Sequence, residues 1–397
     1  GLFDLVVVDE ASHVDQPLAA PALVRAGRAV IAGDPRQLRH VSFVSGDQVR
    51  RAVAAEGTGR LSGLLDVPRM SLLDVAVGAS PAHWLDEHYR CAPHLISFAI
   101  SRFYAGRIAL LTTHPSIADL DCIHVRHVTG TRNAEGVNEA EVAAVVEHAR
   151  RLIAEGATSV GLLSPFRAQA DAIEKAALAG LSLEQITSGG LRVGTVHSFQ
   201  GSECDELVVS LALSDRDPAA SWRFLNDPNL VTVLTTRARR TVALFTSAAQ
   251  PTGLIAEYIA HGESPPSETA GTPTNDEWGA ELATELRRAG HEVRTGYPVG
   301  HWSVDLVVGG GERAIALETR VHQEGVPAHL ARWRTLNAAG WRAYDAYPTR
   351  FGRDSTTAVI QLGTELDQTA HDQTALDQTA LDQTAHDEPA LDETARA

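Results

Sequence analysis

The sequence has few of the residues that mark membrane-spanning, secreted or fibrous proteins. No apolar run approaches the roughly 20 residues that cross a membrane. Three cysteines, Cys91, Cys122 and Cys204, lie far apart among 397 residues. They form neither a disulfide framework nor a metal-binding knuckle, so we expect a reducing, cytoplasmic compartment and no membrane partner. The first residue is Gly1, and no signal-peptide pattern follows it, so we expect a chain that begins inside a domain.

The sequence also has fewer basic residues than acidic ones. The 34 basic residues face 50 acidic ones, a net charge of −16, which excludes a protein coated in basic surface. The excess is uneven, because residues 366–397 hold six Asp, two Glu and one Arg, a net of −7, which leaves −9 for the other 365 residues. A modestly acidic body can still hold a local basic groove, so nucleic acid remains a candidate partner.

Two stretches lack the pattern of a packed element. Residues 366–397 repeat a five-residue unit close to LDQTA, a period that fits neither a helix nor a strand. We therefore expect residues 353–397 to form a low-complexity tail without a core. Residues 249–276 are rich in Pro, Ser, Thr and Gly and indicate a linker.

The body before this linker alternates short apolar runs with helical patterns. Runs buried on both faces and separated by helices predict an α/β fold with parallel sheets. The expected strands are FDLVVVDEA, RAVIAGD, SVGLLSPF, LRVGTVHSF, DELVVSLAL and TVALFTS, and the expected helices are residues 139–155 and 167–180.

Polar residues follow the first two strands. In parallel sheets, ligands bind at the carboxyl ends of strands, which is where Asp9 and Glu10 stand. One carboxylate can hold a hydrated Mg²⁺ while the other orients an attacking water. The second strand ends in Gly33 and Asp34, and Gln37 is then placed to sense a γ-phosphate. Acidic strand ends are common, so the pair alone is a weak signal.

Four further motifs follow in order. Arg90 is the last residue of the first motif, EHYR. An arginine at this position can bind a phosphate by paired hydrogen bonds. The motifs are EHYR at 87–90, LSPFRAQ at 163–169, VGTVHSFQGSE at 193–203 and LTTRAR at 234–239.

Together these motifs resemble the motor of superfamily 1 helicases, in the nonsense-mediated-decay and Dna2-like branch, over residues 1–248. The resemblance implies RecA-like lobes that use ATP and Mg²⁺ to move along DNA or RNA, as a single strand. Residues 1–82 would be the C-terminal half of the first lobe, and residues 83–248 the complete second lobe.

The resemblance also implies a role for each matching residue. Asp9 would hold Mg²⁺, and Glu10 would be the general base for water. Gln37 would couple the γ-phosphate to movement, and Arg90 and Arg237 would contact that phosphate. Gly33, Asp34, Gln200, Gly201 and Glu203 would couple the nucleotide cleft to the nucleic acid, whose backbone Thr195, His197 and Ser198 would touch.

Two departures from the family pattern matter. Where the family has Asn-Val-Ala-Leu-Thr-Arg, this chain has TVLTTR at 232–237, which keeps Arg237. The phosphate-loop pattern GxxxxGK[ST] is absent from the sequence. We therefore expect no independent ATP hydrolysis, and a truncated reading frame or an N-terminal helicase half on another chain.

A small unit, residues 277–352, follows the linker. Its expected order is helix, hairpin, strand and helix, with Asp305 and Glu318 on adjacent strands, where two carboxylates can hold Mg²⁺. This unit resembles the restriction-endonuclease-like (PD-(D/E)XK) fold, especially very-short-patch-repair-like domains. The resemblance makes Glu281 the helix carboxylate, and Asp305 and Glu318 the metal ligands.

The usual lysine of that fold is replaced by Arg320, which cannot share a proton as lysine can. His322 is the candidate that assists instead. The alternative is that these acids are ordinary surface residues in a fold that has lost catalysis.

The sequence thus supports two readings of the whole chain. In the first, it is the C-terminal part of an ATP-dependent helicase or translocase with an appended nuclease-like domain. In the second, it is a non-catalytic module, derived from such a helicase, that binds nucleic acid or a partner without turnover.

Overall fold

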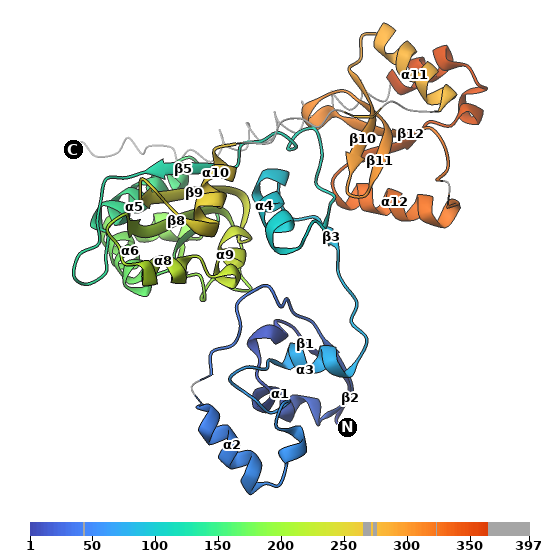
Figure 1. The fold of residues 1–397 in the computed structure, drawn as a ribbon. Coiled ribbons are helices and arrows are strands. Elements are labelled where there is room, and N and C mark those ends of the chain that lie inside the picture. The colour runs from blue at the N-terminus through green and yellow to red at the C-terminus, as the bar shows by residue number, and fades with distance from the viewer. Residues whose placement is uncertain (43, 265–270, 273–275, 323, 364–397) are drawn as a thin grey trace, which may run out of the picture. The chain divides into compact units, whose positions relative to one another are not determined.

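The computed structural model describes residues 1–42, 44–264, 271–272, 276–322 and 324–363. The chain divides into two compact units (Figure 1). No helix in the described ranges is long and apolar enough to cross a membrane. Of the described residues, the first unit combines 1–86, 90–108 and 120–264, and the second combines 87–89, 109–119 and those between 271 and 363.

The first unit begins with a parallel pair of strands. β1 (Phe3–Val8) and β2 (Ala26–Ile31) run side by side, with Val8 opposite Ile31. A small core of Ala11, Ala19, Leu72 and Leu73 packs beneath them. The surrounding elements are η1 (Ala11–His13), α1 (Gln16–Leu23), α2 (Gly46–Ala55), η2 (Gly59–Leu61) and α3 (Leu72–Ala79).

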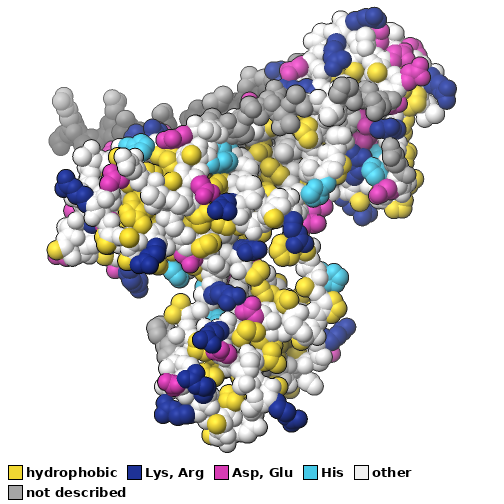
Figure 2. Space-filling model, viewed as in Figure 1, with side chains coloured by type: hydrophobic (Ala, Val, Ile, Leu, Met, Phe, Trp, Pro, Cys, Tyr) yellow, Lys and Arg dark blue, Asp and Glu magenta, His cyan; other side chains and the backbone are white. Residues whose placement is uncertain are grey.

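The β1–β2 pair leaves much apolar surface uncovered. Phe3 is 60% exposed and Val7 is 63% exposed, and Figure 2 shows apolar side chains between arginines on this part of the molecule. Parallel strands are normally covered on both faces, so this pair is a site where further structure can pack.

A five-stranded parallel sheet forms the rest of the first unit. Its order is β5-β9-β8-β6-β7, and each neighbouring pair is parallel, which confirms the predicted α/β class. β5 was not predicted. The strands are β5 (Ile123–His127), β6 (Val160–Ser164), β7 (Arg192–Thr195), β8 (Cys204–Ser214) and β9 (Ala238–Ser247).

Helices cover both faces of this sheet (Figure 1). Val145, Ile173 and Leu162 belong to the core between the sheet and the helices of one face. That face carries α5 (Glu139–Ala154), α6 (Arg167–Gly180) and α7 (Leu183–Ser188); the other carries α4 (Pro93–Phe103), α9 (Pro228–Thr235) and α10 (Gly253–Gly262); and α8 (Ala219–Leu225) follows β8.

Helix α10 departs from the expected linker at 249–276. Its side chains Ile255, Tyr258 and Ile259 are buried, and the rings of Tyr258 and Phe98 of α4 lie 5.2 Å apart. Apolar residues at helical spacing outweigh the small polar residues that surround them. Residues 265–270 and 273–275 of the expected linker lie outside the described residues.

The second unit is built on a mixed sheet. Its order is β10-β11-β12-β13, with antiparallel, antiparallel and parallel pairings. Leu282 of one helix packs on one face, and Leu336 of another packs on the opposite face. The elements are β3 (Glu87–His88), β4 (Ala109–Leu110), α11 (Glu277–Arg288), β10 (Val293–Val299), β11 (Trp302–Val308), η3 (Gly311–Arg313), β12 (Ile315–Glu318), α12 (Val326–Ala338), β13 (Arg342–Asp345) and η4 (Pro348–Phe351).

The start of the expected tail is ordered. Residues 355–363 are helical, and Ala358 and Leu362 are buried in the core of the second unit. These apolar residues precede the five-residue repeats, so the repeat period does not apply to them. The repeats from 366 onward lie outside the described residues.

Candidate nucleotide and nucleic-acid site

Asp9 and Glu10 leave the carboxyl end of β1. Glu10 has φ 51° and ψ 37°, a left-handed conformation that costs energy in a residue other than glycine. Its backbone N–H donates to Asp9 Oδ1 at 2.8 Å. The backbone N–H of Ala11 donates to the Ala32 carbonyl at 2.9 Å. The turn is therefore held in place by β2, and its strain lies at the residue expected to activate water.

The turn after β2 packs directly against the turn after β1. A Cβ atom on Gly33 would lie 3.1 Å from the backbone nitrogens of Ala11 and Ser12, so a larger residue would press on the turn after β1. Asp34 accepts from the backbone N–H of Arg36 at 2.8 Å and from Tyr104 Oη at 2.5 Å. Gly33 and Asp34 thus fix the shape of this turn.

Gln37 is anchored from two directions. Its side-chain amide donates to Asp34 Oδ2 at 3.2 Å, and its backbone carbonyl accepts from Asn229 of α9. Its Oε1 accepts from Arg237 Nη2 at 3.4 Å. The predicted γ-phosphate sensor therefore links the first strand pair to the five-stranded sheet.

Gln200 reaches Glu10 from the turn after β7. Its Nε2 donates to Glu10 Oε2 at 3.1 Å. Its Oε1 is buried without a hydrogen-bond partner in the described part of the chain. Gly201 has φ 71°, and a Cβ there would lie 3.9 Å from Glu10 Oε1. Two of the predicted coupling residues therefore adjoin the predicted base.

Arg237 is a buried cation. It is 3% exposed, and it donates to the carbonyls of Val233 at 3.1 Å and Ser202 at 3.4 Å. Burial lowers the pKa of its guanidinium, which nonetheless stays charged in proteins. Among the described residues, carbonyl and side-chain oxygens rather than a carboxylate hold it, an arrangement that suits an incoming anion.

Arg90 forms an ion pair with Glu203. The two side chains approach to 2.8 Å and are 40% and 31% exposed, so water weakens the pair and an anion can compete for the arginine. Arg90 and Glu203 both act electrostatically on Arg237. The structure thus brings together the predicted residues Glu10, Gln37, Arg90, Gln200, Glu203 and Arg237.

The residues present fit part of a nucleotide. The carboxylates after β1 are oxygen ligands of the kind that Mg²⁺ prefers, and Gln37, Arg90 and Arg237 suit a terminal phosphate. The sequence has one lysine, Lys175, and it lies in α6 with no phosphate-loop pattern before it. No group of three or more His, Cys, Asp or Glu in the described ranges could hold a metal, so phosphate and water would complete the shell of Mg²⁺ at Asp9.

Thr195, His197 and Ser198 line a hollow of about 590 Å³ beside the carboxyl ends of β6 and β7. Ser198 Oγ donates to the Thr195 carbonyl at 2.9 Å, which fixes the turn. Desolvation lowers the pKa of the His197 imidazole. The other lining residues are Pro165, Phe166, Arg167 and Phe224.

This hollow joins the three predicted nucleic-acid residues to an aromatic pair that sequence reasoning missed. The signal for Phe166 and Arg167 was present in LSPFRAQ, directly after a strand. Phe224 carries no comparable signal, because it lies on a seven-residue helix.

In the second unit, Asp305 and Glu318 lie on neighbouring strands. Leu306 pairs with Leu317 in the antiparallel register of β11 and β12, which places the two acids side by side. Asp305 Oδ2 accepts from the backbone N–H of Thr319 at 2.9 Å. Glu318 is 2% exposed, and burial raises the pKa of its carboxyl to about 8.

The remaining predicted nuclease residues are more scattered. Arg320 Nε lies 3.9 Å from Asp305 Oδ1. Glu281 instead accepts from Ser355 Oγ at 2.7 Å, and His322 accepts from the backbone of Glu324. Within the described chain, neither residue bonds to Asp305 or Glu318. Sequence reasoning missed three neighbours: Arg332, 3.7 Å from Glu318, Asp345, opposite Glu318 on β13, and His329, 3.0 Å from Asp345.

Residues 69–249 match a family described as an AAA domain. The chain is 26% identical to the mouse DNA-binding protein SMUBP-2 over 61% of this chain and 24% of that protein. It is 27% identical to the uncharacterized ATP-dependent helicase MG140 of Mycoplasma genitalium over 66% of this chain and 26% of that protein. It is 25% identical to the regulator of nonsense transcripts 1 homolog of Arabidopsis thaliana over 65% of this chain and 21% of that protein.

The chain spans about a quarter of the length of these relatives. The parallel sheets, the grouping of the motif residues around Glu10 and Arg237, the matched domain and the named relatives agree with one another. This part of the chain is therefore similar to an AAA domain and to proteins named as ATP-dependent helicases.

Proposed function

We propose that the first unit is part of an ATP-dependent motor that steps along single-stranded nucleic acid. One observation carries this proposal. The turn after β7 lines the 590 Å³ hollow with Thr195, His197 and Ser198, and at its other end Gln200 bonds to Glu10. A single short segment thus reaches both the predicted base and the predicted nucleic-acid surface.

The coupling follows from this shared turn. Hydrolysis of ATP, bound with Mg²⁺, would supply the free energy. The Gln200 amide occupies one carboxylate oxygen of Glu10. A change in the charge of Glu10 would alter this bond, and the turn would carry the change to Ser198 at the hollow. Arg90 and Arg237 would neutralise the terminal phosphate while Gln37 reports its presence to α9.

The proposal includes a partner segment for β1 and β2. Phe3, Leu5 and Val7 are 60%, 49% and 63% exposed on β1, and burying such surface is favourable. Further parallel strands that carry the phosphate-binding loop would cover it, from the same polypeptide or from another chain. The cradle for the α- and β-phosphates would come with them.

A direct test is binding of a fluorescein-labelled single strand of DNA or RNA by residues 1–397 at low salt. The expected result is binding that Ser198→Ala combined with His197→Ala weakens several-fold, while Gln200→Ala leaves it unchanged. In a protein where residues 1–397 are joined to a phosphate-loop segment, we expect nucleotide to change the affinity for the strand. Gln200→Ala is expected to abolish that change. If the wild-type chain binds neither DNA nor RNA, the proposal that the first unit binds nucleic acid is wrong.

The second candidate function is a module that binds without turnover. The lack of a phosphate-loop pattern and the single lysine of the sequence favour it. The two candidates differ in one measurement, which is ATP turnover after the missing segment is supplied.

For the second unit we propose a domain derived from a metal-dependent nuclease. Asp305 and Glu318 on adjacent strands support this proposal, as does the buried Glu318 oxygen Oε1, which has no hydrogen-bond partner among the described residues. Arg320 in place of lysine favours metal binding without efficient cleavage. Mg²⁺ is the metal that the proposal names.

A further inference from the structure

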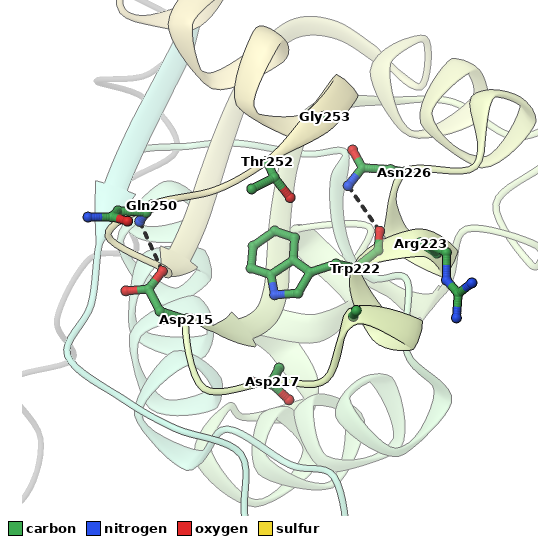
Figure 3. Close-up of a pocket in the computed structure, with 9 residues that line it drawn as sticks. Asp215, Asp217, Trp222, Arg223, Asn226, Gln250, Thr252 and Gly253 are labelled. Atoms are coloured by element: carbon green, nitrogen blue, oxygen red, sulfur yellow. Dashed lines mark hydrogen bonds between the residues drawn. The ribbon is translucent and has the colours of Figure 1, made fainter.

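Two hollows of similar size flank helix α8, and each contains an aromatic side chain from this helix. Phe224 lines the hollow of about 590 Å³, and Trp222 lines another of about 520 Å³. The two residues are two positions apart, or roughly 200° around a helix, so they point to different sides. Figure 3 shows the Trp222 indole lying between Thr252, Asp217 and Asp215.

Charge distinguishes the two hollows. Two acids, Asp215 and Asp217, and one base, Arg223, line the Trp222 hollow. Asp215 is held there by the backbone N–H groups of Ala249 at 3.1 Å and Gln250 at 2.9 Å. Fixed carboxylates repel a phosphate backbone. The described residues that line the Phe224 hollow include no acid and include Arg167. The Phe224 hollow is therefore the one that suits a polyanion.

Phe166 and Arg132 support the Phe224 ring at the edge of its hollow. The guanidinium carbon of Arg132 lies 4.7 Å from the centroid of the Phe166 ring. The centroids of Phe166 and Phe224 are 5.4 Å apart, and their ring planes are tilted by 50°. Arg132 is itself fixed by the Gly136 carbonyl at 3.0 Å. Phe224 is 42% exposed, so its ring is accessible to a planar group.

We propose that a nucleobase of a single strand stacks on Phe224, while Arg167 and the hydroxyls of Thr195 and Ser198 hold the adjacent phosphate and sugar. This inference rests on the proposed function and adds a base-stacking step to it. Every base has an aromatic face, so the step is blind to sequence. A paired base cannot leave its duplex stack without cost, so the hollow selects single strands.

The test compares two labelled strands of the same length, one of thymidine nucleotides and one of abasic nucleotides, which carry equal charge. Anisotropy titrations at low salt would use the full chain and the variants Phe224→Ala, Phe224→Leu and Trp222→Ala. The wild-type chain is expected to bind the thymidine strand roughly 5- to 150-fold more tightly, the range for one stacked base. Both Phe224 variants are expected to lose that preference and retain the affinity for the abasic strand.

Trp222→Ala is the matched control, because it removes the other aromatic of the same helix, and it is expected to keep the preference. Phe224→Leu keeps apolar bulk without the ring, so it separates stacking from a folding defect. Three results would overturn the inference: equal affinity of the wild type for both strands, a preference that survives both Phe224 variants, or a preference lost with Trp222→Ala. Wild-type binding of neither strand would instead count against the proposed function as well.

Discussion

Gln200 and Glu10 lie 190 positions apart in the sequence, and the side-chain amide of Gln200 donates to the carboxylate of Glu10 over 3.1 Å. This bond occupies one of the two carboxylate oxygens of the predicted base. The buried Gln200 Oε1 has no partner in the described part of the chain, so the amide is only half satisfied. An arriving water can donate a hydrogen bond to Oε1, and we expect this contact to be where a coupled movement starts.

We expect purified residues 1–397 to show no ATPase above background, with or without nucleic acid. In the proposed function Glu10 and Arg237 would act only at the terminal phosphate, and the sequence contains no GxxxxGK[ST] pattern to bind the other phosphates. A coupled-enzyme assay measures this directly. Robust turnover that Asp9→Ala abolishes would contradict the expectation.

Glu10→Gln is expected to lower turnover by at least roughly 10²-fold in a protein where residues 1–397 are joined to a phosphate-loop segment. The substitution removes the base and leaves Asp9 to hold Mg²⁺, so nucleotide affinity should stay within a few-fold of wild type. Steady-state kinetics and equilibrium binding of a fluorescent nucleotide separate the two effects. Near-normal turnover would remove Glu10 from the mechanism.

Glu141 on α5 gives a stability prediction, because every group that faces its buried carboxylate is a donor. Ser210 Oγ donates at 2.6 Å, the Ala212 backbone N–H at 2.8 Å and Ser247 Oγ at 2.8 Å. Glu141→Gln would turn an amide N–H₂ toward a donor, so we expect a loss of about 1–3 kcal/mol in the free energy of unfolding. Glu147→Gln on the same helix, at the surface, is the control. An unchanged denaturant midpoint for Glu141→Gln would show that the network is not as described.

The stability of the second unit should depend on the titration of Glu318. Burial raises its pKa from 4.5 to about 8, so the folded state binds a proton that the unfolded state releases. Without metal, this contribution to stability is complete below about pH 4.5, declines as pH rises, and is lost once pH passes about 8. The decline amounts to a few kcal/mol at most.

Denaturant unfolding in EDTA at a series of pH values measures the Glu318 effect. Tryptophan fluorescence reports mainly on the second unit, which contains Trp278, Trp302, Trp333 and Trp341 of the six tryptophans. Glu318→Gln should flatten the profile between about pH 5 and 8. An identical slope for wild type and variant would mean that Glu318 does not titrate in this range.

Mg²⁺ or Mn²⁺ should raise the melting temperature of the second unit by binding Asp305 and Glu318 in the folded state. The shift should be largest above about pH 8, where Glu318 has lost its proton and the two carboxylates repel each other without metal. Asp305→Asn should remove this shift, whereas Glu312→Gln, at the exposed η3, should keep it. Single-stranded, double-stranded and forked DNA then test for cleavage, which we expect to be weak because of Arg320. If neither metal shifts the wild-type melting curve, these acids are structural.

Sequence patterns predicted the elements of the motor well where burial is strong. The apolar runs of β6, β8 and β9 are buried on both faces, so composition alone identified them. β5 was missed, since IHVRH alternates polar and apolar residues at the edge of the sheet. Helix α10 was missed because small and polar residues surround its buried apolar residues Ile255, Tyr258 and Ile259.

The candidate site was predictable only in part. The motifs identified Glu10, Gln37, Gln200 and Arg237, but not which of them touch, because these contacts join segments up to 200 positions apart. The sequence could not predict a role for Phe224, for a different reason. Its role depends on which way a seven-residue helix faces, and so short a helix has no periodicity that sets a direction.

Helix α8 carries one aromatic residue into each of two hollows, and this arrangement ties the hollows to each other thermodynamically. Any occupant that rotates the helix to improve its fit around Phe224 also turns Trp222 relative to Asp215. If occupancy of one hollow changes affinity at the other by some factor, the reverse effect has the same factor. Any ligand of the Trp222 hollow that shifts the seven-residue helix α8 would therefore also change strand binding at Phe224.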